Sequence, residues 1–344
     1  MSEFNGKLLD RSWNYKSVCN EEFIVMQFNV LADGLAQTGN FEYCKPENLE
    51  WEPRWAMMME EIDSVKPDLL CCQEVNFPGV LAQHLEHLGN YSYFNCPKAN
   101  SPAVSTGAQP DGCVMLINND RFEVLDAQIV YYKLGNGINS GGIVVGVKDK
   151  KNGSGLVFST THLKAKASVE NENIRCEQIS QLLLRIKGMR QFVKGCLFAE
   201  ADDNEVGKAS DIGEPKVILT GDFNSSPAGE VYKTIFNDSG IVFESAYNSC
   251  VFKAERPCLE DYISSEVDFT TFKIRKDAGI KKETIDYIWV SRDSQSGISN
   301  KDLDIQCTYS LPSMDQIGEL GLPSASYPSD HLSISAKIGY RALN

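Results

Sequence analysis

The chain has 344 residues with 33 Lys or Arg against 47 Asp or Glu, which gives a formal net charge of −14 at pH 7. A hydrophobic content of 42% is ample for a sizeable core, which excludes a disordered chain and a small disulfide-held scaffold. So acidic a chain has no global attraction for polyphosphate, which disfavours a non-specific nucleic-acid coat protein and requires any phosphate site to be a local basic pocket.

Short apolar runs rich in Val, Ile and Phe, bounded by Gly, Asn, Asp or Pro, predict strands along most of the chain. The expected strands are 23–30, 68–75, 112–118, 142–147, 156–163, 216–223, 284–290 and 331–338. Helical patterns lie between them at 53–65, 78–88, 170–194 and 227–236. Strands and helices alternate except over 112–161, where strand follows strand through Asn/Gly turns. We therefore expect an α/β fold with two packed, mixed sheets and helices outside.

No internal repeat and no linker divides the chain. We expect an N-terminal extension over residues 1–22 and a single domain over 23–340. The one shift in composition is the segment 198–215, which has six acidic residues and one lysine. This composition predicts a solvated acidic surface loop, to which we assign no binding role.

The eleven cysteines are scattered without a C-x-x-C pair, which disfavours a zinc knuckle and a disulfide framework and fits reduced thiols. With only four histidines, a zinc site would have to depend on cysteines. The first twenty residues lack a signal-peptide pattern, and no segment approaches ~18 consecutive apolar residues. We expect a soluble, cytoplasmic, monomeric protein with no membrane contact.

Polar or acidic residues recur at the ends of the expected strands. They are Asn29, Glu74, His162, Asp222 with Asn224, Asp286, and Asp330 with His331. Each has a structural explanation on its own, as a turn, a cap or a solvated strand end. Ligands of α/β sheets bind outside strand ends, and two of the four histidines belong to this set, whereas His84 and His87 fall in a polar helical stretch and need no role. The joint pattern therefore favours one site.

The residue types indicate the chemistry of that site. The candidate ligands are hard oxygens, which suit Mg²⁺ or Mn²⁺ rather than zinc: Glu74, Asn29, Asp222 and Asp286. In Asp222-x-Asn224, the carboxylate can hold and deprotonate an attacking water while the amide donates to phosphoryl oxygens. His331 offers another donor, and Asp330 before it can stabilise the imidazolium form. These are the parts of a metal-assisted phosphoester hydrolase.

Six motifs carry a resemblance to a known family. They are Q-x-N-x-L-A at 27–32, C-C-Q-E-V at 71–75, T-H-L-K at 161–164, G-D-F-N-S at 221–225, D-Y-I at 286–288 and S-D-H at 329–331. Their order resembles that of the endonuclease/exonuclease/phosphatase superfamily. WEPRW at 51–55, PDGC at 110–113, EVYK at 230–233, TTFKIR at 270–275 and LPSASYPSDHLS at 322–333 resemble its deadenylase-related branch, and nocturnin-like members most. The resemblance implies a four-layer α/β sandwich and a Mg²⁺-dependent hydrolase.

The resemblance also implies roles for single residues. Glu74 would be the principal Mg²⁺ ligand, with Asn29 beside it in the metal and phosphate site. Asp222 would activate water, Asn224 would orient phosphate, and Asp286 would support the metal and nucleophile region. His162 and His331 would hold the phosphoryl oxygens.

Two substrates follow from this branch. Its exonucleases remove adenosine 5′-phosphates from poly(A) 3′ ends, whereas nocturnin-like members hydrolyse the 2′-phosphate of NADP⁺ and NADPH to give NAD⁺ and NADH. The second reading implies substrate contacts from Lys98, Asn139, Lys164 and Arg275. Where nocturnin-like proteins have an arginine, this chain has Lys166, which keeps the charge but loses the bidentate fork.

The sequence favours the dinucleotide, because it contains no basic run with stacking aromatics that would track an RNA strand. Poly(A)-specific 3′-exoribonuclease activity stays open as the alternative, with RNA as substrate. A dehydrogenase is rejected because GNGINSGG at 135–142 leads into a β-branched run rather than a helix. A Ser-His-Asp hydrolase is rejected because no G-x-S-x-G elbow occurs. A catalytically dead binding module is disfavoured because Glu74, Asp222 and His331 are all present.

Overall fold

The computed structural model describes residues 8–16, 20–133, 140–202, 213–238, 240–250, 257–292 and 302–341. In this part of the chain, a seven-stranded sheet has the order β1 (Trp13–Tyr15), β14 (Leu303–Tyr309), β15 (Ile334–Tyr340), β2 (Asn20–Asn29), β3 (Leu69–Val75), β5 (Gly112–Asn118) and β4 (Tyr91–Pro97). A six-stranded sheet has the order β10 (Val242–Ser245), β13 (Asp286–Arg292), β9 (Lys216–Asp222), β8 (Gly155–His162), β7 (Gly141–Asp149) and β6 (Phe122–Tyr131).

Both sheets are mixed, as the strand pattern predicted. The parallel pairs are β2 with β3 in the first sheet and β8 with β9 in the second, and the other neighbours are antiparallel. Each parallel pair is joined by a helical crossover, α2 (Trp51–Val65) for the first and α4 (Val169–Asp202) for the second. This placement is expected because parallel neighbours need a long return connection.

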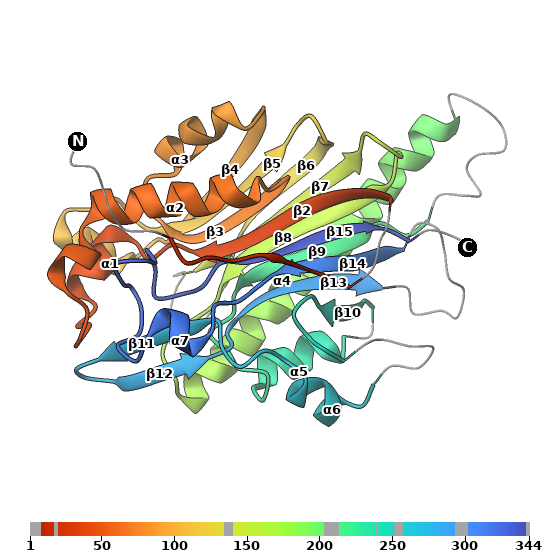
Figure 1. Ribbon diagram of the computed structural model, residues 1–344. Coiled ribbons are helices and arrows are strands. Elements are labelled where there is room, and N and C mark those ends of the chain that lie inside the picture. The colour runs from red at the N-terminus through yellow and green to blue at the C-terminus, as the bar shows by residue number, and fades with distance from the viewer. Residues whose placement is uncertain are drawn as a thin grey trace.

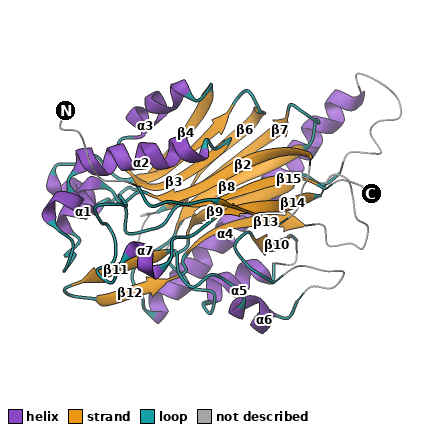
Figure 2. Ribbon diagram, viewed as in Figure 1, coloured by secondary structure: helices purple, strands orange, loops and turns teal. Residues whose placement is uncertain are grey.

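Alternation along the strands builds the four layers (Figure 1). In β3, Leu69 and Cys71 face the core between the sheets, whereas Leu70 and Cys72 pack in the outer core with α2. The outer face of the second sheet packs against α4 and α5 (Glu230–Phe236), where Trp289 is fully buried. Figure 2 shows the two sheets with helices on both outer faces, so the predicted four-layer α/β sandwich is confirmed.

The remaining elements are short. They are α1 (Asp33–Thr38), α3 (Pro78–His84), α6 (Leu259–Ser264), α7 (Met314–Ile317), three 3₁₀ turns at Pro46–Leu49, Leu85–His87 and Pro102–Thr106, and the hairpin β11 (Thr271–Arg275) with β12 (Gly279–Glu283). The hairpin and α1 lie at one end of the sandwich (Figure 1). Within the described residues, no helix is both long and apolar enough to span a membrane, and every cysteine is a free thiol.

Several predicted boundaries differ from the structure. The last strand begins at Ile334 instead of residue 331, because Asp330 and Leu332 bond to the backbone of Phe272 and Thr270 near β11. The expected acidic loop at 198–215 is helical as far as Asp202, and 203–212 lies outside the described residues. Part of the expected N-terminal extension belongs to the first sheet, since β1 pairs with β14.

Candidate active site

Three neighbouring strands of the second sheet place His162, Asp222 and Asp286 side by side. His162 is the register partner of Asp222 in the parallel pair β8 and β9, and Asp286 is its partner in the antiparallel pair β13 and β9. All three side chains are buried. Register partners that are 60 and 64 positions apart in the sequence therefore meet at the ends of neighbouring strands, as the strand-end pattern predicted.

The first sheet supplies Asn29 at the end of β2 and Glu74 in β3. Asn29 Nδ2 donates to Asp222 Oδ2 at 2.9 Å and to Glu74 Oε1 at 3.3 Å, while its Oδ1 accepts from the backbone N–H of Leu31 at 3.1 Å. Asn29 thus bridges the two sheets through its amino group. Its oxygen accepts from Leu31 and keeps a second lone pair, so the expectation that Asn29 ligates a metal stays a prediction.

The backbone at Glu74 is left-handed, with φ of 59°. The register between β3 and β5 shifts between Cys72 and Val75, so Glu74 occupies a bulge in the ladder. A non-glycine residue in this conformation stores strain of about 1 kcal/mol or more, and such strain recurs at functional sites. Its carboxylate is 14% exposed and receives only weak contacts, at 3.3 Å from Asn29 and 3.4 Å from the Ala32 N–H.

Asp222 is held by a tight turn. Its Oδ1 accepts from the backbone N–H of Asn224 at 2.9 Å, and Asn224 has a φ of 48°. A Cβ at Gly221, whose φ is 152°, would lie 2.4 Å from Thr161 O, so glycine is required for the close approach of β9 to β8. Asn224 Nδ2 donates to Leu163 O at 3.2 Å, which fixes its amide beside Asp222.

His162 faces the carboxylates from one side. Its Nε2 lies 3.5 Å from Asp222 Oδ2 and 4.0 Å from Glu74 Oε1. Burial, reinforced by the Lys98 ammonium, lowers the pKa of His162, so the ring is neutral at pH 7. Its Nδ1 is buried without a hydrogen-bond partner in the described part of the chain.

His331 faces Asp222 from the other side. Its Nδ1 lies 2.9 Å from Asp286 Oδ2, its Nε2 lies 3.8 Å from Asp222 Oδ2, and Thr270 Oγ1 donates to Asp286 at 2.7 Å. Burial and the Lys273 ammonium oppose protonation of His331, but the carboxylates of Asp286, Asp222 and Asp330 together outweigh them and raise the ring's pKa. The carboxylate that bonds to this imidazole is Asp286. Asp330, which the sequence suggested, also favours the imidazolium form, but through its charge and without a hydrogen bond to the ring.

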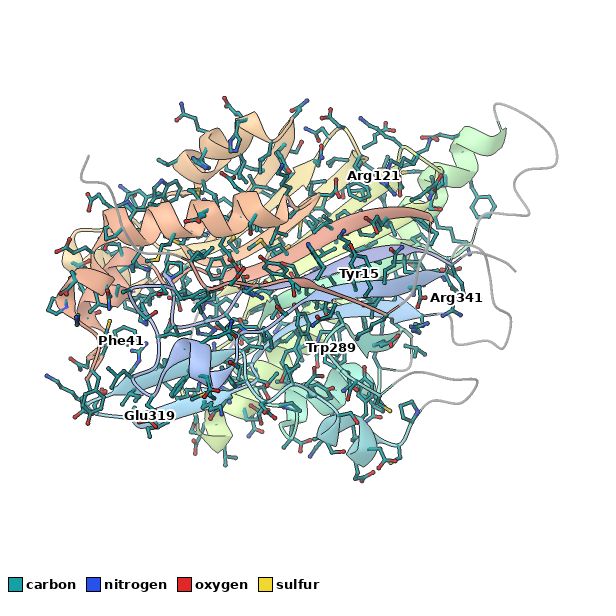
Figure 3. The ribbon with its side chains drawn as sticks, in the orientation of Figure 1. Tyr15, Phe41, Arg121, Trp289, Glu319 and Arg341 are labelled. Carbon is teal, nitrogen blue, oxygen red and sulfur yellow. The ribbon has the colours of Figure 1, made fainter. Side chains whose placement is uncertain are left out.

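Asp330 instead holds two cations from β11. Its Oδ2 lies 2.6 Å from Lys273 Nζ and 3.2 Å from Arg275 Nη2. Burial raises the pKa of Asp330, but Lys273, His331 and Arg275 outweigh it and hold the pKa well below its usual range. Arg275 also lies over the ring of Phe41, 4.6 Å from its centroid. Phe41 is labelled in Figure 3.

The surroundings of Asp222 also favour the ionised form of its carboxyl group. Burial raises its pKa, but the His331 and His162 rings and the Asn29 amide outweigh burial and hold the pKa below its usual value. One oxygen each of Asp222 and Asp286 and one ring nitrogen of His331 lie within 4.8 Å of one another, which makes this group a second candidate for a metal besides Glu74.

The remaining predicted residues are three lysines and one asparagine. Lys98 Nζ bonds to Asp111 Oδ2 at 2.7 Å, and its charge acts on His162 and Glu74. Lys164 is half-buried and Lys166 exposed, and neither amine pairs with a carboxylate among the residues that the structure describes. Asn139 lies outside the described residues.

Sequence reasoning missed three contributors. Lys273 Nζ lies 3.3 Å from His331 Nε2, and Thr270 holds Asp286. Both belong to the TTFKIR segment, where Lys273 stands two residues before Arg275 and so faces the same side of the strand, a signal that was available. Arg54 donates to Val30 O and Pro328 O, and burial lowers its pKa to about 10. The position of Arg54 in WEPRW did not indicate that its side chain is buried and bonds to these backbone oxygens.

Comparisons with known proteins agree with this geometry. Residues 26–331 match the model of the Endonuclease/Exonuclease/phosphatase family. Nocturnin of Xenopus laevis is 34% identical over 317 residues, covering 91% of this chain and 71% of the relative, and Nocturnin of Homo sapiens is 33% identical, covering 90% and 63%. The solved human Nocturnin catalytic domain with a bound sulfate anion superimposes with a TM-score of 0.68 at 26% identity, covering 96% of this chain and 97% of that one.

Proposed function

The chain belongs to the endonuclease/exonuclease/phosphatase family, as a deadenylase-related phosphohydrolase similar to nocturnin, and from that premise we propose that it removes the 2′-phosphate of NADP⁺ and NADPH in a Mg²⁺-dependent reaction. The observation that carries the substrate is the pair of amines at Lys164 and Lys166, two and four residues after His162, with which no carboxylate of the described residues pairs, in a chain whose net charge is −14. Uncompensated positive charge beside a carboxylate and histidine cluster is what a phosphorylated dinucleotide requires.

The donor set fits a hard divalent ion. Glu74 offers a carboxylate that is partly open and weakly bonded, with a second anionic group at Asp222. Mg²⁺ takes one or two carboxylates and retains waters. Bound there, Mg²⁺ would neutralise phosphoryl charge and increase the acidity of water. We assign Glu74 as its ligand and Asn29 as the residue that holds Glu74 and Asp222 in place.

Asp222 is the proposed general base. Its lowered pKa keeps it ionised at neutral pH, so it can accept a proton from the attacking water. One N–H of the Asn224 amide bonds to Leu163, which leaves the other to donate to a phosphoryl oxygen. His162 and His331 flank Asp222 and donate to the remaining phosphoryl oxygens, and Asp286 holds the His331 ring through Nδ1.

The cations divide into two groups around these residues. The charge of Lys98 acts on His162, and Lys164 and Lys166 follow His162 in the sequence. Lys273 and Arg275 pair with Asp330, next to His331. Two groups suit a substrate with two phosphate centres, the 2′-phosphate and the diphosphate bridge. We propose that the lysines after His162 and Arg275 contact these centres, with Lys98 contributing charge through its pairing with Asp111.

The test is a direct comparison of NADPH and a 3′-oligo(A) RNA, each with Mg²⁺ and with a chelator. We expect Mg²⁺-dependent phosphate release from NADPH that Lys164→Ala/Lys166→Ala weakens through KM. Lys150→Ala/Lys151→Ala is the matched control, since these lysines lie in the turn at the opposite end of β8. Rapid RNA shortening without phosphate release from NADPH would assign the alternative poly(A) exoribonuclease activity instead.

Arg275→Ala adds a test of the pocket. Its guanidinium is 29% exposed, its Nε is unpartnered within the described chain, and only one nitrogen bonds to Asp330. We expect this variant to weaken NADPH hydrolysis more than hydrolysis of a generic phosphoester such as p-nitrophenyl phosphate. Equal losses on both compounds would contradict a pocket for the 2′-phosphate.

A further inference from the structure

Three side chains outside the active site converge between two helices on the outer face of the first sheet. Asp63 belongs to α2, His84 ends α3, and His87 ends the 3₁₀ turn that follows. Asp63 Oδ2 lies 3.7 Å from His84 Nε2, and Asp63 Oδ1 lies 3.3 Å from His87 Nε2. One ligand atom from each of the three lies within 4.8 Å of the others. Two of the four histidines of the chain are therefore gathered with a carboxylate here.

The orientation of both rings is fixed. His87 Nδ1 lies 2.6 Å from the backbone oxygen of His84. A carbonyl can only accept, so Nδ1 carries the proton, and in the neutral ring Nε2 presents its lone pair to Asp63. The His84 ring packs edge-on against Trp55, with centroids 6.0 Å apart and an interplanar angle of 80°. This arrangement is the one found behind metal-bound histidines, whose second nitrogen donates to a carbonyl or carboxylate.

The atoms that face one another are not satisfied by hydrogen bonds. His84 Nε2 and Asp63 Oδ1 are both buried, and neither has a hydrogen-bond partner among the residues that the structure describes. Asp63 Oδ1 and His87 Nε2 are 3.3 Å apart, yet no hydrogen bond joins them. A buried polar atom without a partner is unfavourable, and each such atom in a folded protein calls for a reason. A shared cation between the three groups would supply partners for all of them.

We propose that Asp63, His84 and His87 form a binding site for a borderline transition-metal ion, of which Zn²⁺ is the representative. Imidazole nitrogens with one carboxylate suit Zn²⁺, whereas Mg²⁺ prefers oxygen ligands alone. Zinc bonds of about 2.0 to 2.1 Å in a tetrahedron place neighbouring ligand atoms about 3.3 Å apart. The separations of 3.3 Å from Asp63 Oδ1 to His87 Nε2 and 3.7 Å from Asp63 Oδ2 to His84 Nε2 lie near this spacing, and each histidine faces a different oxygen of the carboxylate.

The position of the cluster defines what bound metal would do. The three side chains are 33 to 50% exposed, which leaves the fourth coordination position to water and the site open to exchange with solvent. The ion would join α2 to the end of α3 and its 3₁₀ turn. The helix α3 follows β3, which carries Glu74, directly along the chain. The bound ion would therefore fix the position of α3 close to the strand end that presents Glu74. The sequence expectation that zinc would depend on cysteines does not apply to this cluster.

The test measures metal stoichiometry on the full chain. Protein freed of metal by chelation is placed in excess Mg²⁺ and titrated with Zn²⁺ against a chromophoric chelator, and Co²⁺ serves as a spectroscopic substitute. We expect one equivalent of Zn²⁺ that Mg²⁺ does not displace and a visible Co²⁺ spectrum with nitrogen ligation. His87→Gln and Asp63→Asn should each lose this equivalent and the spectrum, and Glu86→Gln, an exposed neighbour that contributes no ligand, should keep both.

His87 is half-exposed, so His87→Gln is expected to fold, and an unchanged circular dichroism spectrum and unchanged Mg²⁺-dependent activity verify this. If Asp63 only forms ion pairs with the two histidines, no Mg²⁺-resistant equivalent of Zn²⁺ is expected. If wild-type protein and His87→Gln bind the same number of Zn²⁺ ions, the ions belong to the active site or to thiols and the proposal is overturned. Absence of any Mg²⁺-resistant Zn²⁺ in wild-type protein overturns it equally.

Discussion

Replacing Asp222 by asparagine tests the proposed base with the smallest change of shape. In the native site, Oδ1 accepts from the Asn224 N–H and Oδ2 accepts from Asn29 Nδ2, each at 2.9 Å. An asparagine at this position has a single oxygen, so one of the two donors would face an amino group. The variant therefore loses the negative charge and one charge-assisted hydrogen bond, but no volume.

The expected magnitude differs for catalysis and for stability. Removing a general base costs about 10²- to 10⁴-fold in kcat, or about 3 to 5 kcal/mol in the activation free energy. Loss of the hydrogen bond costs about 1.5 to 3 kcal/mol of folding free energy, and relief from burying a charge offsets much of it. We therefore expect kcat for phosphate release from NADPH to fall by about 10³-fold while the urea midpoint changes little.

The concentration of Mg²⁺ separates a base from a metal ligand. Asp222 also belongs to the group with Asp286 and His331 that could hold a metal, and a ligand variant would recover activity as Mg²⁺ or Mn²⁺ is raised. A base variant stays inactive at saturating metal. Asp120→Asn, at an exposed carboxylate, is the control and should match wild type. Retention of more than a tenth of wild-type kcat, or rescue by metal, refutes the assignment of Asp222 as the base.

Three further predictions concern neighbouring groups. Gly221→Ala should destabilise the fold by about 3 kcal/mol, because its Cβ would lie 2.4 Å from Thr161 O, and a urea midpoint equal to that of wild type would contradict the close approach. Lys166→Arg should lower KM for NADPH about threefold with kcat unchanged, because the fork of arginine binds phosphate bidentately, and an unchanged KM would show that residue 166 does not contact phosphate. Asp330→Asn should cost about 3 kcal/mol at pH 7, since it leaves Lys273 without its carboxylate. Because the folded pKa of Asp330 lies well below its unfolded value, this stabilisation is complete above about pH 5, starts to decline below about pH 4 and is fully lost only when the pH falls through the folded pKa, so a difference between the two urea midpoints that is as large at pH 3 as at pH 7 would refute it.

The strand-end residues could be predicted because each lies next to a continuous apolar run in the sequence. His162 and Asp222 both close such runs, and the structure places them as register partners. The pairing itself could not be derived, since strand order and register depend on packing between distant segments. The same limit explains why Asp286 was not identified as the partner of His331, which is 45 positions away, whereas the adjacent Asp330 was.

Local composition misled the prediction of several elements. The segment 198–202 is acidic but contains Ala and Glu, which are good helix formers, so α4 continues to Asp202 where a loop was expected. The strand β12 is short and mostly charged and lacks the alternation that marks a half-buried strand, so the β11–β12 hairpin was not predicted. His84 and His87 gave no signal either, because their convergence with Asp63 depends on the packing of α3 against α2.

The polar contacts beneath the active site also fix the position of one sheet on the other. The core between the sheets is apolar, and apolar packing is non-directional, so it specifies their relative position only through shape. At the site, Asn29 of the first sheet donates to Asp222 of the second at 2.9 Å, and Gln73 donates to Thr160 at 3.0 Å. A shift of one sheet against the other would leave these buried groups unpaired, at about 1 to 3 kcal/mol each. Asn29, which bonds to both Glu74 and Asp222 in the proposed site, therefore also helps to hold the two halves of the sandwich in register.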